Sequence, residues 1–334
     1  MQPYERLERD LARWAGFEPE NVVACSSGTA ALHLALEAMD LPSGSRVIVP
    51  DYTMIACPRA VSMAGMVPTF VDCKPDLTIN EEKVAECIER HDEDPNDSRV
   101  TAIMAVHVYG RSCDMSAITD IAGKYELWVI EDLAEAHGMP PHPLTDAACY
   151  SFYRNKIVAG EEGGAVILTN EDYSHRARML RSLGFTADHD YTHIPRGHNY
   201  RLANTLASLI GASLAQVKTN TAKRWAQYDI WDSACPNAWR MAPPDQPWVY
   251  SFRVPGMWAE LQTAVVRAIQ GMGIEARHGF KPCRRQEEYV GGFEPGAEWE
   301  SDRAAREVVY LPVDRLGTGD MARAVFTKIA DMVG

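Results

Sequence analysis

Short apolar runs alternate with amphipathic stretches along the first half of the chain. Four runs lack regular polar alternation, as strands buried on both faces do: Val47–Pro50, Val67–Val71, Ala102–Val108 and Trp128–Ile130. Between them, apolar residues recur three or four positions apart, as in helices, in Thr29–Met39, Met54–Ala64, Glu81–Arg90 and Met115–Tyr125. This order extends from about Val22 to Thr169 and predicts a doubly wound α/β domain.

The pattern changes after Thr169. Three further segments are expected in this order: a helix at Tyr173–Leu183, a polar loop at Asp188–Arg196, and a long helical segment from about Leu202 to Ile230. Four prolines between residues 236 and 247 then indicate a linker. Beyond it we expect strands at Trp248–Val254 and Gly273–Arg277, and helices at Met257–Met272 and Gly319–Met332. We therefore divide the chain into a large α/β domain, residues 1–235, and a small C-terminal α+β domain, residues 236–334.

The overall charge limits the class of partner. The 334 residues carry a net charge of −13. Binding to a nucleic-acid backbone needs a basic face, so this charge argues against nucleic acid as the main partner. A small anionic substrate stays compatible, because the local field in a cleft can oppose the overall charge.

Apolar runs and cysteines bear on the cellular compartment. No apolar run approaches the roughly 20 residues that a membrane-spanning helix needs, and Met1–Arg13 lacks the apolar stretch of a signal peptide. The eight cysteines are scattered without a C-x-x-C pair. That distribution favours reduced thiols over a disulfide framework or a zinc site. We expect a cytoplasmic protein, and the spacing of ligand residues supports no metal site.

The first candidate binding segment is Ser26–Leu32, a small polar turn directly before a helix rich in Ala and Leu. A helix N-terminus presents unpaired N–H groups and the positive end of the helix dipole, which together bind phosphate. Gly28 allows close approach to the backbone, and Thr29 adds a hydroxyl. A serine or threonine here is also an ordinary helix N-cap, so both interpretations stay open.

Two acids, Glu131 and Asp132, end an apolar strand in the segment Val129–Gly138. The carboxyl ends of parallel strands are where α/β proteins place ligands. One buried carboxylate there can pair with a heterocyclic nitrogen and keep it protonated. The alternative is an acid that caps a following helix.

Lys156 stands in a loop after a strand and precedes the glycine-rich segment Gly160–Gly164. Lysine forms Schiff bases once its ammonium loses a proton, although a lone loop lysine is most often a solvated surface charge. The order of the three segments within one α/β domain changes this balance. A phosphate cradle, a strand-end acid and a lysine are the anchors that pyridoxal 5′-phosphate needs.

The order of motifs resembles the DegT/DnrJ/EryC1/StrS family of pyridoxal-phosphate-dependent nucleotide-sugar aminotransferases. The similar segments span most of the chain: Ser27–Leu32, Val106–Gly110, Asp114–Met115, Ile130–Asp132, Ala136–Gly138, Ser151–Gly164, Gly197–Leu202, Gly273–Arg277 and Leu311–Pro312. The resemblance implies fold type I, the aspartate-aminotransferase fold. We thus expect a large, mainly parallel seven-stranded α/β domain with an N-terminal helix and a long interdomain helix, and a small C-terminal α+β domain.

The resemblance also implies roles for single residues. Lys156 is expected to carry the cofactor, and Asp132 to contact its pyridine nitrogen. Ser151 is implied as a phosphate ligand beside Gly28 and Thr29.

A homodimer with shared active sites is implied as well. Gly197–Leu202 resembles the segment that a neighbouring subunit extends into the active site. Asn199, with or without Arg201, is therefore expected at the partner's cofactor.

Two residues at the expected cofactor site depart from the family pattern. Met54 stands where the family has an aromatic residue on the pyridine ring, and a thioether packs on a ring less rigidly. Glu135 stands where the family has Gln or His near the phenolic oxygen. An ionised carboxylate would repel that oxygen, so Glu135 is protonated, turned away or used on the substrate. The loops from Asn170 to Arg196 and before Trp248, which help to shape the substrate site, are compact.

The resemblance implies transfer of an amino group from an amino acid, with L-glutamate as the expected donor, to a keto-sugar nucleotide or a similar keto acceptor. Met54 and Glu135 motivate a second interpretation. In it, the same cofactor serves decarboxylation, elimination or dehydration of a non-sugar or modified-nucleotide substrate. A third interpretation is a regulatory or scaffold protein that binds the cofactor without turnover.

Four further residues are weaker candidates. Arg277 and Arg253 can bind a carboxylate or a diphosphate, or they are surface arginines. His107 and His137 are expected to be packed, hydrogen-bonded residues rather than catalysts.

Overall fold

The computed structural model describes the chain except residues 93–97, 187–190, 291–297, 316 and 334, so part of the expected loop Asp188–Arg196 lies outside the described residues. Seven strands form one sheet in the order β1-β7-β6-β5-β4-β2-β3. Their bounds are β1 Val22–Cys25, β2 Arg46–Pro50, β3 Val67–Val71, β4 Val100–Val106, β5 Trp128–Asp132, β6 Ala147–Ser151 and β7 Gly164–Leu168. The pairings from β3 to β6 are parallel, whereas β7 is antiparallel to β6 and β1. The expected large, mainly parallel seven-stranded sheet is confirmed.

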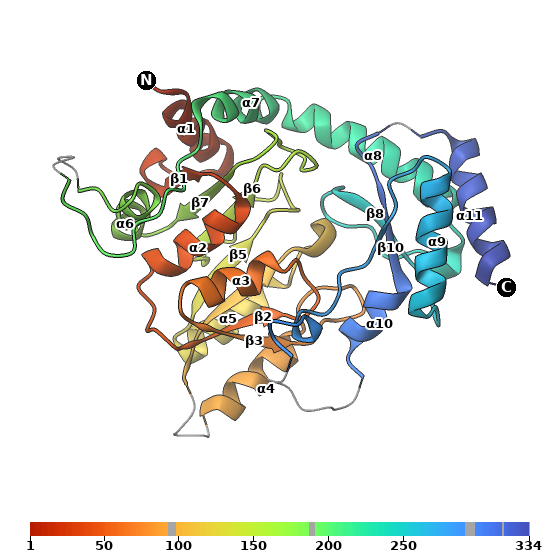
Figure 1. Cartoon of the computed structure of the whole chain (residues 1–334), viewed down its shortest axis with the longest axis horizontal. Helices are drawn as coiled ribbons and strands as arrows, with labels where there is room; N and C mark the ends of the chain where they lie inside the picture. The colour runs from red at the N-terminus through yellow and green to blue at the C-terminus, as the bar shows by residue number, and fades with distance from the viewer. Residues whose placement is uncertain (93–97, 187–190, 291–297, 316, 334) are drawn as a thin grey trace.

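Helices cover both faces of this sheet (Figure 1). They are α1 Pro3–Ala15, α2 Gly28–Ala38, α3 Ala56–Met63, α4 Glu81–Asp92, α5 Met115–Tyr125, α6 Glu171–Arg181 and α7 Asn204–Leu214. Because neighbouring strand residues point to opposite faces, Val47 and Val49 of β2 pack with α2, α3 and α6. Ile48 packs on the other face with α4 and α5, and α1 and α7 extend that layer over β1, β6 and β7.

The helical segment expected from Leu202 to Ile230 is divided into two helices. α7 ends at Leu214 and α8 spans Val217–Ala234. α8 leads away from the large sheet toward the C-terminal helices (Figure 1). Its Tyr228 and Trp231 pack into the core of a second, smaller sheet. Within the described residues, no helix has the length and apolar character needed to cross a bilayer.

The smaller sheet has three strands in the order β8-β10-β9. Its elements are β8 Val249–Arg253, α9 Ala259–Gly271, β9 Arg277–His278, α10 Glu300–Glu307, β10 Val308–Pro312 and α11 Gly319–Val333. Short 3-10 helices lie at Pro19–Asn21, Val108–Gly110, Asn237–Trp239 and Cys283–Arg285. The division of the chain into domains at residues 235 and 236 stays a prediction.

Two expected strands differ from their sequence pattern: one is almost absent, and β4 begins and ends two residues earlier than expected. The strand at Gly273–Arg277 is wrong for all but its last residue, because Gly273 turns the chain at φ +81° after α9. β4 ends at Val106, because Tyr109 and Gly110 turn the chain with φ values of 57° and 78°. A side chain at Gly110 would collide with the backbone carbonyl of Gln246, so only glycine fits there.

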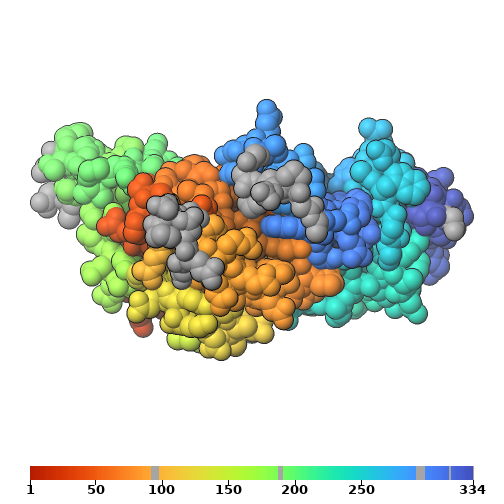
Figure 2. Space-filling model, turned by 90° about the horizontal axis from the view of Figure 1, so that it is seen from below, coloured from red at the N-terminus to blue at the C-terminus, as the bar shows by residue number. Residues whose placement is uncertain are grey.

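A buried ionic cluster ties the C-terminal part of the chain to the end of β2. Asp51 is fully buried and accepts hydrogen bonds from the Arg284 backbone N–H at 2.8 Å and the Ser301 hydroxyl at 2.6 Å. The Arg284 guanidinium pairs with both Asp51 and Asp302. Burial raises the pKa of Asp51. In Figure 2 the blue C-terminal residues accordingly lie against the orange residues of the first half of the chain.

Arg284→Met should lower the free energy of unfolding by about 3–5 kcal/mol, because the fully buried Asp51 would lose the guanidinium that pairs with it. Equilibrium unfolding in urea, followed by circular dichroism, measures the loss. Arg285→Met is the matched control, since Arg285 also pairs with Asp302 but its side chain is 59% exposed. Its loss should stay below about 1 kcal/mol. Equal losses in the two variants would contradict the role of the buried cluster.

Candidate active site

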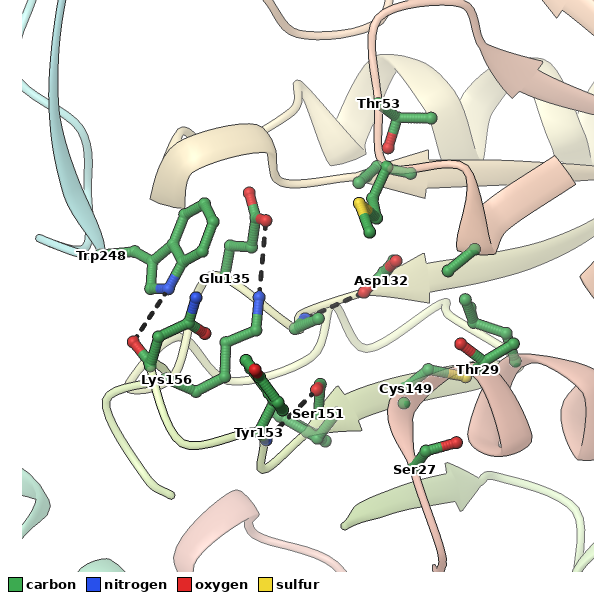
Figure 3. Close-up of a pocket in the computed structure, with 18 of the residues that line it drawn as sticks. Ser27, Thr29, Thr53, Asp132, Glu135, Cys149, Ser151, Tyr153, Lys156 and Trp248 are labelled. Atoms are coloured by element: carbon green, nitrogen blue, oxygen red, sulfur yellow. Dashed lines mark hydrogen bonds and ion pairs between the residues drawn. The ribbon is translucent and has the colours of Figure 1, made fainter. Parts of the chain in front are cut away.

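A cavity of about 430 Å³ lies at the carboxyl edge of the large sheet. The last residues of β4, β5 and β6, which are Val106, Asp132 and Ser151, all line it. Thr29 lies at one end of the cavity and Trp248 at the other (Figure 3). This edge of a parallel sheet is where α/β proteins bind ligands.

The N-terminus of α2 forms one end of the cavity. Ser27 is the cap of this helix, because its Oγ accepts a hydrogen bond from the Ala30 N–H at 3.1 Å. A Cβ at Gly28 would lie only 2.6 Å from the Ser151 Cβ, so glycine lets the helix and β6 approach. Gly28, Thr29 and Ser151 all line the cavity. First-turn N–H groups together with two hydroxyls form a site suited to phosphate.

The two acids at the end of β5 point to opposite faces of the sheet. Glu131 faces away from the cavity and accepts hydrogen bonds from the Thr145 hydroxyl and the His142 N–H, and it pairs with His107 Nε2 at 2.9 Å. Asp132 faces the cavity and is 6% exposed. The chain after Asp132 enters a turn rather than a helix, so the helix-capping alternative is wrong.

Asp132 is held in one orientation by two donors. Its Oδ1 accepts the Ala134 N–H at 2.9 Å, and its Oδ2 accepts the Cys57 thiol at 3.2 Å. Burial raises the pKa of the Cys57 thiol, so the sulfur keeps its proton and donates. Asp132 is thus a fixed, buried acceptor at the cavity wall.

Lys156 points into the cavity from the loop after β6 (Figure 3). Its side chain is only 10% exposed, so it is not a solvated surface charge. The Nζ lies 3.5 Å from Glu135 Oε1 and 4.1 Å from the ring centroid of Trp248. The Arg224 guanidinium fixes the loop, because it donates to the carbonyls of Asn155 and Lys156 at 3.0 Å each.

Glu135 lines the cavity and is not turned away from it. Its Oε2 accepts the Tyr109 N–H at 2.8 Å, while its Oε1 faces Lys156. Burial raises the pKa of Glu135, against the opposing effects of the Lys156 charge and the Tyr109 N–H. The carboxylate therefore serves as a partner of the lysine amine within the described chain.

Of the two remaining residues expected at the cofactor, Met54 lies at the cavity and Asn199 does not. Met54 lines the cavity and is 52% exposed. Asn199 is exposed, accepts a hydrogen bond from Arg201 at 3.2 Å, and does not line this cavity. The segment after α6 lies at the end of the molecule opposite α9 and α11 (Figure 1).

The cavity also contains residues that the sequence analysis did not assign to it, most notably Trp248 and Tyr310 from the small-sheet part of the chain. Trp248 belongs to no family-like segment, and Tyr310 only precedes Leu311–Pro312; the packing of the small sheet brings both residues to the cavity. Arg277 lines the cavity as well, on its exposed rim. Arg253 does not line it, because Glu300 and Glu307 bind its guanidinium.

Both motif histidines are packed, as expected, and the expected hydrogen bonds are present for His107. His107 pairs with Glu131 and accepts the Cys113 N–H at 3.1 Å. His137 is fully buried between the rings of Tyr150 and Phe152, with centroids 5.7 Å away in each case. Burial lowers the pKa of His137 to about 3, helped by the nearby Lys156 and Arg224 charges.

The donor set of the cavity fits pyridoxal 5′-phosphate. The helix end at Gly28 suits the phosphate, the buried Asp132 suits a protonated pyridine nitrogen, and the Lys156 amine suits the aldehyde. These three groups on a mainly parallel seven-stranded sheet define a pyridoxal-phosphate-dependent enzyme of fold type I. The chain belongs to the DegT/DnrJ/EryC1/StrS aminotransferase family, whose family model matches residues 2–330. It is a pyridoxal-phosphate-dependent aminotransferase, as expected.

Similar proteins support this assignment. GDP-perosamine synthase of Caulobacter vibrioides is 32% identical over 298 residues, which cover 85% of this chain and 78% of the relative. A dTDP-3-amino-3,6-dideoxy-alpha-D-galactopyranose transaminase of Aneurinibacillus thermoaerophilus is 35% identical over 227 residues, 65% of this chain and 59% of the relative. The structure of S. venezuelae DesV in complex with a ketimine intermediate superposes with a TM-score of 0.85 at 26% identity, covering 99% of this chain and 90% of that chain.

His137→Phe should weaken the acid sensitivity of folding. The folded pKa of about 3 lies below the ordinary histidine value, so stability is present above about pH 6.5 and is lost as the pH falls toward 3. From pH 7 to pH 5 the wild type should lose about 2 kcal/mol more than the variant. Urea unfolding of both proteins at the two pH values measures this difference. Parallel losses would contradict a buried, neutral His137.

Proposed function

We propose that this enzyme transfers the amino group of L-glutamate to a keto-sugar nucleotide. The observation that carries the proposal is the single cavity in which Lys156 and Asp132 meet at the sheet edge. The relatives whose names refer to GDP- and dTDP-linked amino sugars support a nucleotide sugar as the acceptor. L-Glutamate is the donor that the family resemblance implies.

We assign the cofactor site to residues on β5, on β6, at the N-terminus of α2 and in the loop before α3. Pyridoxal phosphate, when bound, supplies an electron sink for chemistry at the donor's α-carbon. Asp132, fixed by two hydrogen bonds, keeps the ring nitrogen protonated. Gly28, Thr29 and Ser151 bind the phosphate at the end of α2. Met54 packs its thioether against the ring at the cavity mouth.

Lys156 moves the proton at the donor's α-carbon, because its amine is the base inside the cavity. Glu135, at 3.5 Å, and the Trp248 ring, at 4.1 Å, orient the Nζ when it is free. The Trp248 indole also excludes water from that side of the amine. We therefore assign Glu135 to the lysine rather than to the phenolic oxygen of the cofactor.

Arg277 is the candidate anion ligand for the substrates. It stands in β9 on the rim of the cavity, with its side chain 59% exposed and paired with Glu275. A guanidinium binds carboxylates and phosphates in a bidentate manner. A substrate carboxylate or diphosphate that enters the cavity can therefore replace Glu275 as its partner.

The active enzyme is proposed to be a homodimer. Asn199 is exposed and does not line the cavity of its own chain, which supports a contact with the cavity of a partner.

The eight cysteines are all free and buried, which supports a reducing cytoplasmic compartment. The net charge of −13 supports small-molecule partners rather than nucleic acid.

Lys156→Ala should abolish transamination and the visible absorption of the lysine-bound cofactor, because the variant has no amine to bind the cofactor or move the proton. Absorption spectra before and after addition of L-glutamate, and then of keto-sugar nucleotides, measure both effects. Lys156→Arg, which keeps the charge beside Glu135, is the control and should be equally inactive. Turnover in either variant would contradict the proposal.

The same assay separates the proposed reaction from the alternatives. Amino exchange between glutamate and the acceptor supports an aminotransferase. Release of carbon dioxide or water without amino exchange would favour decarboxylation, elimination or dehydration. No conversion of the cofactor by any donor would favour a binding protein without turnover.

Hybrid dimers test whether Asn199 acts on the partner's cofactor. Asn199→Ala homodimers should lose roughly tenfold in activity, the effect of one lost hydrogen bond. A hybrid of one Lys156→Ala chain and one Asn199→Ala chain should recover about half of wild-type activity, because one of its two sites is intact. Co-expression with two different tags allows its isolation. No recovery above the mean of the two mutant homodimers would contradict the shared site.

A further inference from the structure

A cluster of three side chains that can bind a metal ion lies outside the active-site cavity. His33 and Glu37 stand four residues apart on α2 and therefore share one face of the helix. His198 reaches them from the segment after α6, 161 residues from Glu37 in sequence. One ligand atom from each residue lies within 4.8 Å of the other two. None of the three lines the Lys156 cavity.

His33 carries a buried nitrogen that forms no regular hydrogen bond with the described residues. Its side chain is 3% exposed, and its Nδ1 hydrogen-bonds with the Tyr200 hydroxyl at 3.1 Å. The Nε2 forms no hydrogen bond of regular geometry with the described residues; it has a weak contact with the Met63 backbone and lies 3.7 Å from Glu37 Oε1. An unsatisfied buried polar group is unfavourable. This nitrogen therefore points to a ligand between the three side chains.

Of the contacts among His33, Glu37 and His198, only the one between Glu37 and His198 is a hydrogen bond. Glu37 Oε2 and His198 Nε2 lie 2.5 Å apart. Between Glu37 and His33 the separation is too long for a hydrogen bond. When Nδ1 donates its proton to Tyr200, Nε2 presents a lone pair to the cluster.

We propose that His33, Glu37 and His198 bind a zinc ion. Zinc takes imidazole nitrogen and carboxylate oxygen at about 2.0–2.2 Å in tetrahedral sites, so neighbouring ligand atoms stand roughly 3.3 Å apart. The observed separations are close enough for rotation of the side chains to reach that geometry. Magnesium and calcium prefer oxygen ligands alone, which this cluster does not offer. A water molecule completes the tetrahedron.

Tyr200 supports both imidazoles of the site. Its hydroxyl fixes the tautomer of His33, which is the usual task of a residue behind a metal ligand. Its ring stacks on His198 at a centroid distance of 4.8 Å and an interplanar angle of 16°. The backbone of Tyr200 is fixed in turn by hydrogen bonds with Ser26 at 2.8 Å and Arg181 at 2.9 Å.

The proposed ion has a route of entry and a structural consequence. Glu37 also lines a second cavity, of about 630 Å³, whose other lining residues include exposed ones. A bound ion ties the segment that carries Asn199 to α2, the helix that begins at the active-site cavity.

The sequence supported no metal site because spacing rules detect ligands that lie near one another along the chain, whereas His198 lies 161 residues from Glu37.

Zinc titration of the full chain, loaded with cofactor and free of any affinity tag, tests the proposal. After treatment with a chelator, the protein is dialysed against micromolar Zn²⁺, and bound metal is counted by mass spectrometry. The wild type should retain about one zinc per chain. His33→Gln, Glu37→Gln and His198→Gln should each lose it. Tyr200→Phe keeps all three ligands and should weaken zinc binding by about tenfold or more in competition with a chromophoric chelator.

Two controls keep the result specific. His175→Gln removes an exposed imidazole from α6 and should bind zinc as the wild type does. Unchanged circular dichroism and an unchanged urea midpoint in the metal-free ligand variants separate the loss of a zinc ligand from misfolding of α2. X-ray absorption should show nitrogen and oxygen neighbours at about 2.0 Å and no sulfur. Wild-type protein that retains no zinc, unchanged binding in His33→Gln, or sulfur ligands would each overturn the proposal.

Discussion

Parallel pairing of β5 with β6 is the constraint on which the rest of the site depends. Ile130 to Asp132 lie opposite Ala147 to Cys149, so the carboxyl ends of both strands reach the same edge of the sheet. Strand alternation then sends Asp132 into the cavity and Glu131 to the opposite face. The close approach of Gly28 to β6 brings the end of α2 to this edge as well.

The cavity places the Lys156 amine between one carboxylate, Glu135, and the aromatic ring of Trp248. Burial raises the pKa of Glu135, and the facing Lys156 opposes that effect. A neutral Gln at position 135 would bind the lysine amine less strongly. The negative charge of Glu135 therefore helps to hold the Lys156 amine in place. Glu135 departs from the family pattern, and its contact with Lys156 explains this departure. The class of reaction does not need to change.

Local patterns predicted four strands of the large sheet and the residues of its motifs, and the family resemblance implied the seven strands. Neither predicted the contacts that long connections create. Asp132 ends one buried strand and Lys156 lies in the loop after the next, so the strand pattern indicates where both residues stand. Trp248 reaches the cavity only through the packing of the small sheet, and His198 reaches α2 only through the return of the chain after α6. The prediction of a strand at Gly273–Arg277 was wrong because the chain turns at Gly273, after α9. An apolar pattern does not reveal such a turn.

The central claim is that Lys156, rather than another lysine, holds the cofactor opposite Asp132. Borohydride reduction of the cofactor-loaded protein, followed by proteolysis and mass spectrometry, locates the covalently bound cofactor directly. The account predicts one modified peptide, which contains Lys156, and no modification in Lys156→Ala. Modification of a different lysine in the wild type, or no modification at all, would contradict it.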